Sequence, residues 1–184
     1  MIHFKIQFIA VVAIMIATGT NAKNMNNKNN TAAQGQVIKN GKLVYSEIVI
    51  NATPEKVWKV FTDFAAYPQW NPFIKSFSGK PVVGGNIEVL LHLPGGKPMT
   101  FKPLVLQYQQ NKELRWIGKL FVGRIFDGEH TFQLKDNGDG TTTFIQYEHF
   151  RGILIPFMKQ MLDVQTLNGF KLMNEKLKER TEHQ

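Results

Sequence analysis

The segment 50–74 (INATPEKVWKVFTDFAAYPQWNPFI) constrains the fold most, because a strand end, a helix and an aromatic turn follow one another within it. Its helix has a clear start: Thr53 can cap the first turn, Pro54 suits the first helical position, and Glu55 favours the positive end of the helix dipole. Apolar residues then recur at helical spacing. We therefore expect a helix over 54–62 that begins directly after a strand.

The rest of the chain shows strand patterns followed by one long helical pattern. A one-turn helix is expected near 65–70, and from 156 to about 181 apolar residues recur with the period of an amphipathic helix. A run of strands with helices at its ends indicates the α+β class. We expect a curved antiparallel sheet of about six to seven strands around the long C-terminal helix, with two short helices after the first strand. The predicted strands are 43–50, 73–78, 86–93, 99–110, 114–120, 129–135 and 141–150.

The start of the chain has the pattern of a secretory signal peptide. Lys5 gives a positive start, residues 6–17 are apolar apart from one glutamine, and Thr20 and Ala22 occupy the small-residue positions of a cleavage site. The apolar run is shorter than the roughly 20 residues of a spanning helix, which disfavours an uncleaved membrane anchor. We therefore expect a periplasmic or secreted protein. The predicted organisation is a signal peptide over 1–22, a disordered Asn-rich linker over 23–42 and a ligand-binding domain over 43–182.

The formal net charge is +8, but the Lys and Arg residues are scattered along the chain. Their densest cluster lies on the expected last helix, where Lys171, Lys176, Lys178 and Arg180 alternate with glutamates. This pattern is more typical of a solvated helix face than of a binding patch, although peripheral contact with an anionic membrane stays open. Scattered charge and the expected export argue against a nucleic-acid partner. The sequence has no cysteine, which excludes disulfides and a cysteine nucleophile.

A hairpin is predicted around 136–140, whose Asp, Asn and Gly residues give a strong turn signal. With this loop, Lys135 pairs with Thr141, and His130 lies opposite Gln146. Side chains alternate along a strand, so even-numbered residues of both strands share one face, which we expect to point inward because it is more aromatic. A register shift of one residue would turn the whole set outward. The inward set is Phe126, His130, Phe132, Leu134, Phe144, Gln146, Glu148 and Phe150.

Three of these inward residues, His130, Gln146 and Glu148, are polar. A buried carboxylate without a partner is costly, so Glu148 should form a hydrogen bond, and His130 lies diagonally across the predicted hairpin from it. Two interpretations stay open. In the first, the polar groups satisfy one another inside the core, or Glu148 holds a turn near Gly152. In the second, they orient the polar end of a ligand in a cavity that contains water.

Large apolar side chains elsewhere are candidates for the core or for a cavity wall. Trp116, on the strand next to the hairpin, fits either role equally well. Gly169, within the last helix, would let another element approach closely. Methionines on that helix are adaptable and would suit ligands of varied shape. The residues of this helix assigned to the core are Phe157, Met158, Met161 and Leu162.

Four segments carry a resemblance: INATPEKVWKVFTDFAAYPQWNPF, ELRWIGKL, FDGEHTFQL and TTTFIQYEHFRGIL, the last of which runs into the helix with Phe170, Met173, Asn174 and Leu177. Over about residues 43–180 the chain resembles the START-like, or SRPBCC, superfamily, and in particular its polyketide cyclase/dehydrase-like branch. The resemblance implies the helix-grip fold, with a cavity for a hydrophobic ligand between sheet and C-terminal helix. It does not imply one reaction, because the superfamily includes lipid carriers, hormone-binding proteins, aromatase/cyclases, chaperone activators and toxin-resistance proteins.

The expected ligand-binding residues combine the inward face of the hairpin with side chains from other elements. The five histidines are far apart in sequence, and no metal-binding, phosphate-binding or serine-nucleophile motif is present, so we expect no metal and no cofactor. Only His130 and Glu148 could form a general acid–base pair. The expected ligand-binding residues are Trp70, Trp116, Phe126, His130, Phe132, Phe144, Gln146, Glu148, Phe150, Phe157 and Met161.

These observations favour an exported, non-enzymatic protein that binds a lipid or another hydrophobic small molecule. The alternative is a polyketide cyclase/dehydratase-like or hydrolytic enzyme that uses His130 and Glu148 as its acid–base pair. A third hypothesis is an interaction module that places its basic last helix on an anionic membrane or an acidic partner.

Overall fold

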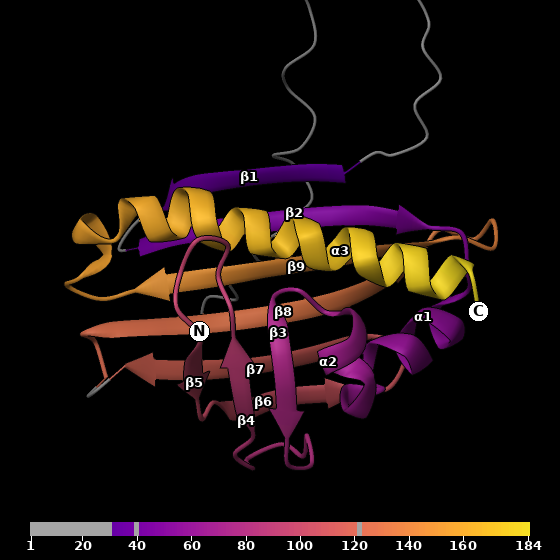
Figure 1. The fold of residues 1–184 in the computed structure, drawn as a ribbon, viewed down its shortest axis with the longest axis horizontal. Helices are drawn as coiled ribbons and strands as arrows, with labels where there is room; N and C mark the ends of the chain where they lie inside the picture. The colour runs from indigo at the N-terminus through magenta and orange to yellow at the C-terminus, as the bar shows by residue number, and fades with distance from the viewer. Residues whose placement is uncertain (1–30, 39–40, 121–122) are drawn as a thin grey trace, which may run out of the picture.

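A long antiparallel sheet is crossed by one long helix (Figure 1) in the computed structural model, which describes residues 31–38, 41–120 and 123–184. The strands of this large sheet are β1 (Thr31–Ile38), β2 (Gly41–Ile50), β6 (Leu104–Gln109), β7 (Glu113–Leu120), β8 (Phe126–Asp136) and β9 (Thr142–Arg151). Their order is β1-β2-β9-β8-β7-β6. The expected signal peptide and residues 23–30 of the expected linker lie outside the described residues.

Strand β1 differs from the sequence prediction, because it lies within the segment 23–42, whose composition predicts a disordered linker. It pairs along its whole length with β2, from Thr31 opposite Ile48 to Ile38 opposite Gly41. Such pairing uses backbone N–H and C=O groups, which every residue other than proline provides, so a polar composition does not prevent an edge strand. The sheet therefore begins before the predicted domain start at residue 43.

A smaller sheet has the strand order β3-β4-β5, and its strands are β3 (Ile74–Ser78), β4 (Glu88–Leu91) and β5 (Met99–Phe101). The sequence predicts a single strand over 99–110, and this prediction is wrong, because the chain leaves the small sheet after β5 and joins the large sheet as β6. Pro103 lies at the break, where it lacks an N–H for a ladder. Its carbonyl accepts a hydrogen bond from the N–H of Ile87 at 3.1 Å.

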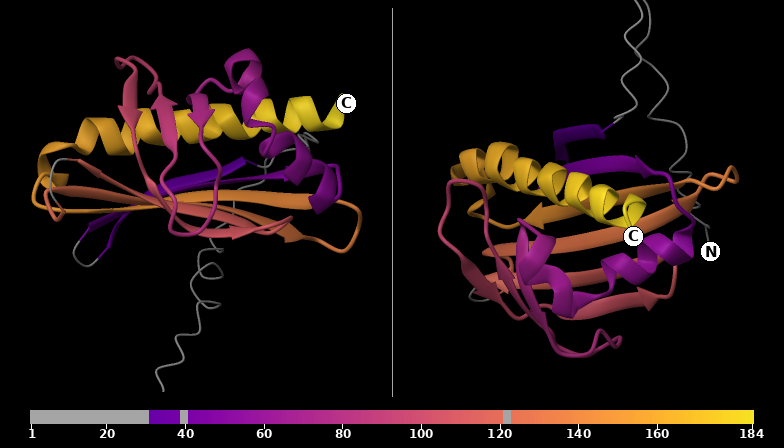
Figure 2. Two further views of the ribbon diagram at one scale, coloured as in Figure 1. Left: turned by 90° about the horizontal axis from the view of Figure 1, so that it is seen from below. Right: turned by 45° about the vertical axis from the view of Figure 1, so that its right-hand side comes forward.

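The helices and the small sheet all lie on one face of the large sheet (Figure 2). Helix α1 (Pro54–Phe61) begins as expected, although Thr53 contributes its carbonyl to the N–H of Val57 and forms no side-chain cap. The C-terminal helix begins with a π-helical segment (Met161–Thr166) and continues as α3 (Leu167–Glu182). The remaining helical elements are the 3-10 turns Phe64–Ala66 and Ile155–Phe157 and the helix α2 (Tyr67–Trp70). The predicted α+β class and helix-grip arrangement are confirmed, with six strands in the large sheet.

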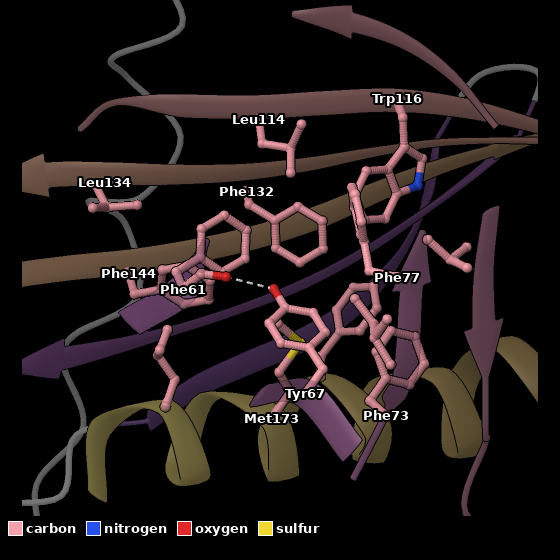
Figure 3. Close-up of a cluster of buried hydrophobic side chains, with 14 of the residues drawn as sticks. Phe61, Tyr67, Phe73, Phe77, Leu114, Trp116, Phe132, Leu134, Phe144 and Met173 are labelled. Atoms are coloured by element: carbon pink, nitrogen blue, oxygen red, sulfur yellow. Dashed lines mark hydrogen bonds between the residues drawn. The ribbon is translucent and has the colours of Figure 1, made fainter. Parts of the chain in front are cut away.

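The core lies between the large sheet and these helices and is strongly aromatic. Phe61 packs against Phe132 and Phe144 (Figure 3). The centroid of its ring lies 5.1 Å from that of Phe132 and 5.3 Å from that of Phe144. The buried hydroxyl of Tyr67 donates a hydrogen bond of 2.7 Å to the carbonyl of Phe61. This bond satisfies both polar groups, so the aromatic cluster carries no penalty for burying them.

Close packing and an ion pair hold the first part of the C-terminal helix against the rest of the fold. Gly169 is buried against Phe73, and a Cβ there would lie 2.5 Å from Cδ2 of that ring. The close approach expected at this glycine is therefore confirmed. Six residues earlier, Asp163 of the π-helical segment forms an ion pair with Lys42 of β2, and this lysine is buried.

The hairpin β8–β9 differs from the prediction in its register but not in its face. His130 lies opposite Glu148, two residues away from its predicted partner Gln146. The loop has its predicted length but is shifted by one residue, because Asp136 pairs with Thr142 and residues 137–141 form the loop. Within it, the N–H of Asn137 donates a hydrogen bond to the carbonyl of Thr141. A shift of two residues preserves side-chain parity. The predicted inward face is therefore confirmed, with every member buried except Glu148, which is half-buried.

Candidate functional site

A small cavity lies between the large sheet, the small sheet and the π-helical segment. Its volume is about 60 Å³, which is room for roughly four to six water molecules at about 10–15 Å³ each. The wall is mostly apolar, and its polar side chains are those of His130, Glu148 and Thr166. The other lining residues are Phe73, Val89, Leu91, Leu93, Met99, Phe101, Pro103, Trp116, Gly118, Phe126, Gly128, Phe150 and Met161.

His130 of β8 and Glu148 of β9 form the polar corner of this cavity. Nδ1 of His130 lies 3.6 Å from Oε2 of Glu148, just beyond hydrogen-bond distance. Burial lowers the pKa of His130 to about 3, with the Gln146 amide acting in the opposite direction, and burial raises the pKa of Glu148 to about 8. At neutral pH the corner therefore holds a neutral imidazole and a protonated carboxylic acid.

Aromatic rings surround the imidazole of His130. It stacks on Phe132 and Phe170, with ring centroids 4.1 and 4.7 Å away, and Trp116 meets it edge-on at 5.5 Å. Its Nε2 is buried and has no hydrogen-bond partner within the part of the chain that the structure describes. An unpaired polar atom on a residue that lines a cavity is a group that a water molecule or a ligand can satisfy.

Glycine makes room for the carboxyl group of Glu148. Gly128 precedes His130 by two residues on β8, and a Cβ there would lie 2.3 Å from Oε1 of Glu148. Directly opposite on β7, Gly118 also lines the cavity. Neither glycine is among the predicted site residues, although glycine inside a strand is a known signal for the close approach of another group.

Gln146 does not line this cavity. Its amide nitrogen donates to the carbonyl of Phe170 at 3.0 Å and to Oδ1 of Asn174, whose own amide donates to Oγ of Ser46 at 3.0 Å. All four residues are fully buried, and their hydrogen bonds join α3 to β9 and β2. Gln146 therefore fits the first interpretation through its amide nitrogen, although its Oε1 has no hydrogen-bond partner among the described residues. His130 and Glu148 instead border a cavity, as in the second interpretation.

The other predicted ligand-binding residues of the hairpin and its neighbours divide between cavity and core. Phe132 and Phe144 lie outside the cavity wall, fully buried against Phe61. The hairpin face therefore serves two purposes, one end lining the cavity and the other filling the core. The predicted residues that line the cavity besides His130 and Glu148 are Trp116, Phe126, Phe150 and Met161.

Two further predicted ligand-binding residues, Phe157 and Trp70, also lie away from the cavity. Phe157 is 84% exposed, so its assignment to the core is wrong. It belongs to the 3-10 turn before the C-terminal helix and not to the face of that helix. Trp70 is half-buried at the end of α2, beside a separate surface groove formed with the end of α3.

The small sheet supplies part of the cavity wall that the sequence analysis missed. Alternation along a strand shows which residues share a face, but it does not show which sheet the strand joins. The residues that were not predicted are Val89 and Leu91 of β4, Met99 and Phe101 of β5, and Phe73 and Leu93, which lie outside these strands.

The chemistry available at the site is hydrogen bonding and proton transfer. Glu148 as a carboxylic acid can donate a hydrogen bond, and a neutral imidazole can donate one and accept another. Within the described ranges, no group of three or more His, Cys, Asp or Glu side chains is placed to hold a metal ion. No helix among the described residues is long and apolar enough to cross a membrane.

Solved structures with this fold include a protein from Mesorhizobium loti, which is 21% identical with a TM-score of 0.57 over 77% of this chain and 97% of that chain. A START superfamily protein from Mycobacterium smegmatis is 20% identical, with a TM-score of 0.59 over 77% and 97%. A protein from Rhodobacter sphaeroides is 16% identical, with a TM-score of 0.61 over 83% and 99%. At these identities the likeness shows the fold alone.

No curated protein matches the chain significantly. A family model described as "Polyketide cyclase / dehydrase and lipid transport" matches residues 43–182, and that range contains every residue of the cavity wall. The match covers most of the chain, and the structure has the helix-grip fold with a cavity between sheet and C-terminal helix. The chain therefore belongs to this family of START-like, or SRPBCC, proteins.

Proposed function

We propose that this protein binds an uncharged hydrophobic small molecule, with the apolar body between the large sheet and the π-helical segment and one polar atom against Glu148 and His130. The observation that carries the proposal is the composition of the cavity: an apolar wall with two neutral hydrogen-bonding groups at one corner. Pockets for small molecules typically have this composition. The family description, which includes lipid transport, supports the same class of ligand.

The charge of the cavity wall supports an uncharged ligand. None of the described lining residues is Lys or Arg, so a carboxylate, sulfonate or phosphate would be buried without a countercharge, which is costly. The carboxylic acid of Glu148 can instead donate a hydrogen bond to a carbonyl or hydroxyl oxygen. Molecules with one such oxygen on an apolar skeleton, such as long-chain alcohols and aromatic ketones, match the site.

The cavity is smaller than such a ligand, because pockets for molecules of this size measure about 300–1,000 Å³. Binding therefore requires side chains or the π-helical segment to move. Met161 of that segment lines the cavity and is half-buried, and methionine is the apolar side chain that adapts most readily to a new shape. Single π-helical turns are often found at functional sites, which agrees with movement at this point.

Two dyes with one skeleton test the proposal: N-phenyl-1-naphthylamine, which is uncharged, and its sulfonated analogue 1-anilinonaphthalene-8-sulfonate. In fluorescence titrations of the full chain at pH 7, we expect saturable binding of the uncharged dye and binding of the sulfonate that is about tenfold weaker or more. Failure of the uncharged dye to saturate, or equal binding of both dyes, would overturn the proposal.

Gly118→Val shows whether the dye occupies this cavity. Gly118 lines the cavity, and a Cβ there meets nothing closer than the carbonyl oxygen of Gly128 at 4.0 Å. A valine side chain is therefore expected to enter the cavity without a backbone clash. We expect the variant to keep its thermal stability and to lose binding of the uncharged dye. Unchanged dye binding would place the dye elsewhere on the molecule.

A second candidate function is catalysis by the same pair, favoured by one observation: a carboxylic acid with a pKa of about 8 faces a neutral imidazole at 3.6 Å beside the cavity. General acids and bases work best when their pKa lies near the working pH. In a cyclase/dehydratase-like or hydrolytic enzyme, Glu148 would protonate a ligand oxygen and His130 would accept a proton. Glu148→Gln and His130→Ala should then bind an aromatic ketone or ester but no longer turn it over; unchanged turnover would remove this candidate.

We also propose that the chain is exported and that its signal peptide is cleaved after Ala22. The positive start, the apolar run over 6–17 and the small residues before the cleavage point support this proposal. The full chain is expressed in a bacterial host, and the host is fractionated. We expect the protein in the periplasmic or extracellular fraction with Lys23 as its first residue. A cytoplasmic protein with an intact start would contradict it.

A further inference from the structure

One end of the molecule combines exposed apolar side chains with exposed cations. It lies at the left of Figure 1, where β9 ends and the C-terminal helix begins. We call residues 123–125 and 151–160 at this end the tip. Ile153 and Phe157 of the tip are 72% and 84% exposed, the two highest values among the large hydrophobic side chains that the structure describes. Neighbouring exposed apolar side chains of this size mark an interaction site more often than scattered single ones do.

Hydrogen bonds and close packing hold the two parts of the tip together. The N–H of Ile153 donates to the carbonyl of Arg124, and the N–H of Leu154 donates to the carbonyl of Ile125, both at 3.2 Å. Gly152 has a φ of +133°, and a Cβ there would lie 2.3 Å from the carbonyl oxygen of Ile125. The apolar side chains are therefore presented to solvent by a built structure and not by a loose end.

The charges around the tip are mainly positive. Arg124, Arg151 and Lys159 are exposed, and none of them forms an ion pair among the residues that the structure describes. The acidic groups nearby are engaged: Asp127 accepts a hydrogen bond of 2.9 Å from the N–H of Arg124, and Asp163 forms an ion pair with the buried Lys42. Exposed cations around an apolar centre complement an anionic lipid surface, where apolar groups enter the lipid boundary and cations meet the phosphates.

The tip is continuous with the cavity. Phe150 lies just before it in sequence and Met161 just after it, and both line the cavity. Phe126, which follows Ile125, lines the cavity as well. Docking at the tip would therefore bring this part of the cavity wall close to a bilayer.

We propose that the tip docks on an anionic lipid bilayer. Ile153 and Phe157 enter the lipid boundary, and Arg124, Arg151 and Lys159 contact the headgroup phosphates. This inference goes beyond the proposed ligand binding, because docking does not depend on the cavity being filled.

The basic face of α3, which the sequence analysis considered for membrane contact, is less suited to this role. Lys176 pairs with Glu179 at 2.5 Å, and Lys178 pairs with Glu182 at 2.8 Å. Two of the four cations on this face thus have their own carboxylates, as in a solvated helix face, and the other two, Lys171 and Arg180, are half-buried. The tip instead offers cations without such partners beside the most exposed apolar side chains.

A local dye tests the docking. Because the chain has no cysteine, Phe157→Cys can carry one environment-sensitive nitrobenzoxadiazole label, and Val83→Cys, at a position 64% exposed on the β3–β4 connection, is the matched control. The full chain is mixed with phosphatidylcholine vesicles that contain or lack phosphatidylglycerol. We expect the label at 157 to brighten and shift to the blue with anionic vesicles only, and the label at 83 to stay unchanged. The apolar segment 6–17 is common to both proteins, so attachment through it cannot produce this difference.

Vesicle sedimentation separates the apolar and ionic parts of the contact. Ile153→Ser with Phe157→Ser should weaken binding to anionic vesicles by about tenfold or more, because an inserted phenyl ring is lost. Replacing Arg124, Arg151 and Lys159 together by Gln should weaken binding to a similar degree, about tenfold or more. Added salt should weaken wild-type binding, because it screens exposed charges.

Two control variants distinguish the tip from other exposed apolar and basic parts of the surface. Val82→Ser with Val83→Ser removes exposed apolar side chains elsewhere, and Lys176→Gln with Lys178→Gln removes cations of α3. Both should bind anionic vesicles as the wild type does. Docking through the tip would be overturned by unchanged fluorescence of the label at position 157, or by an equal loss of vesicle binding in the control variants. An equal fluorescence change with neutral and anionic vesicles would overturn the ionic part of the contact.

Discussion

At the scale of single residues, the polar corner of the cavity depends on a glycine. A methyl group at Gly128 would lie 2.3 Å from Oε1 of Glu148 and 3.3 Å from the ring of Phe150, so the carboxyl group would have to move. We expect Gly128→Ala to lower the free energy of unfolding by about 1–3 kcal/mol, the usual effect of overpacking. Binding of N-phenyl-1-naphthylamine should weaken as well. Urea unfolding and dye titration measure the two effects.

Gly118 is the matched control, because it lies directly opposite Gly128 and lines the same cavity. A Cβ at Gly118 has no neighbour closer than 4.0 Å. Gly118→Ala should therefore be neutral or slightly stabilising, since alanine restricts the unfolded chain more than glycine does. Equal destabilisation by both substitutions would contradict a specific contact between residue 128 and Glu148.

The ionisation of Glu148 should make the stability of the fold depend on pH. Burial raises its pKa from 4.5 to about 8, so the folded state keeps a proton that the unfolded state releases, and the free energy of unfolding falls as the pH rises through this interval. For His130, whose pKa is lowered from 6.5 to about 3, stability is lost as the pH falls. The two effects oppose each other between about pH 4.5 and 6.5, so the loss above pH 6.5 belongs to Glu148 alone.

We expect the free energy of unfolding to fall by about 2 kcal/mol between pH 6.5 and 8, because one pKa unit corresponds to about 1.4 kcal/mol. Glu148→Gln keeps the shape of the side chain and removes the titrating proton, so its stability should be level over this window. Urea denaturation at a series of pH values provides the measurement. A wild-type curve as level as that of the variant would show that Glu148 is not held in its protonated form.

Side-chain parity is the part of the site that the sequence predicts well. Alternation determines which residues of β8 and β9 share a face, and an error of two residues in their pairing leaves every residue on that face. The pairing itself depends on how the loop closes, through hydrogen bonds of Asn137 and Asp139 to Thr141 that the turn pattern does not specify. The inward direction of His130 and Glu148 was therefore predictable, and their direct opposition was not.

At the scale of elements, α3 packs so closely against Phe73 that glycine is favoured over alanine at one helical position. A Cβ at Gly169 would lie 2.5 Å from Cδ2 and 3.0 Å from Cε2 of Phe73. On an exposed helix, alanine would be favoured over glycine by about 1 kcal/mol. Here the clash outweighs that preference, so we expect Gly169→Ala to lower the free energy of unfolding by about 1–3 kcal/mol. Thermal or urea unfolding measures it.

Asn168, the exposed neighbour on the same helix, is the control for this prediction. Asn168→Ala should be neutral or stabilising by a few tenths of a kcal/mol, because alanine is the better helix former and the side chain faces solvent. If Gly169→Ala were stabilising as well, α3 would not be in close contact with Phe73.

Elements with strong local signals were predictable, whereas their assignment to sheets was not. The Thr-Pro-Glu start specified α1, and the Asp/Asn/Gly turn specified the β8–β9 hairpin. The segment 99–110 has one continuous strand pattern, yet its halves pair with different partners, and the break at Pro103 depends on a contact with Ile87, which is distant in sequence. Pairing partners are non-local, so the contribution of the small sheet to the cavity could not be predicted from periodicity.

At the scale of the whole molecule, packing and ligand binding oppose each other. The aromatic core and the side chains of the C-terminal helix leave a cavity of only about 60 Å³. Every side chain that fills this space stabilises the fold and must be displaced when a ligand enters. Substitutions that enlarge the cavity should therefore lower stability and raise affinity, the opposition between stability and activity found at many functional sites.

Met161→Ala tests this opposition. Met161 is half-buried on the π-helical segment and lines the cavity. We expect its truncation to lower the free energy of unfolding by about 2 kcal/mol, the lower end of the range for methionine because the side chain is partly exposed. The affinity for N-phenyl-1-naphthylamine should rise, because less packing has to be displaced. Urea unfolding and dye titration on the same preparation measure both quantities.

Met173 on α3 distinguishes cavity volume from general loosening. It is fully buried and lies outside the cavity wall, so Met173→Ala should lower the free energy of unfolding by about 2–5 kcal/mol and leave the dye affinity unchanged. If both methionine variants raised the affinity alike, binding would follow the overall loss of stability. Higher dye affinity in Met161→Ala alone would mean that the space between the sheet and the π-helical segment sets the affinity. Met173→Ala, which loses more stability, would then show no gain in dye affinity.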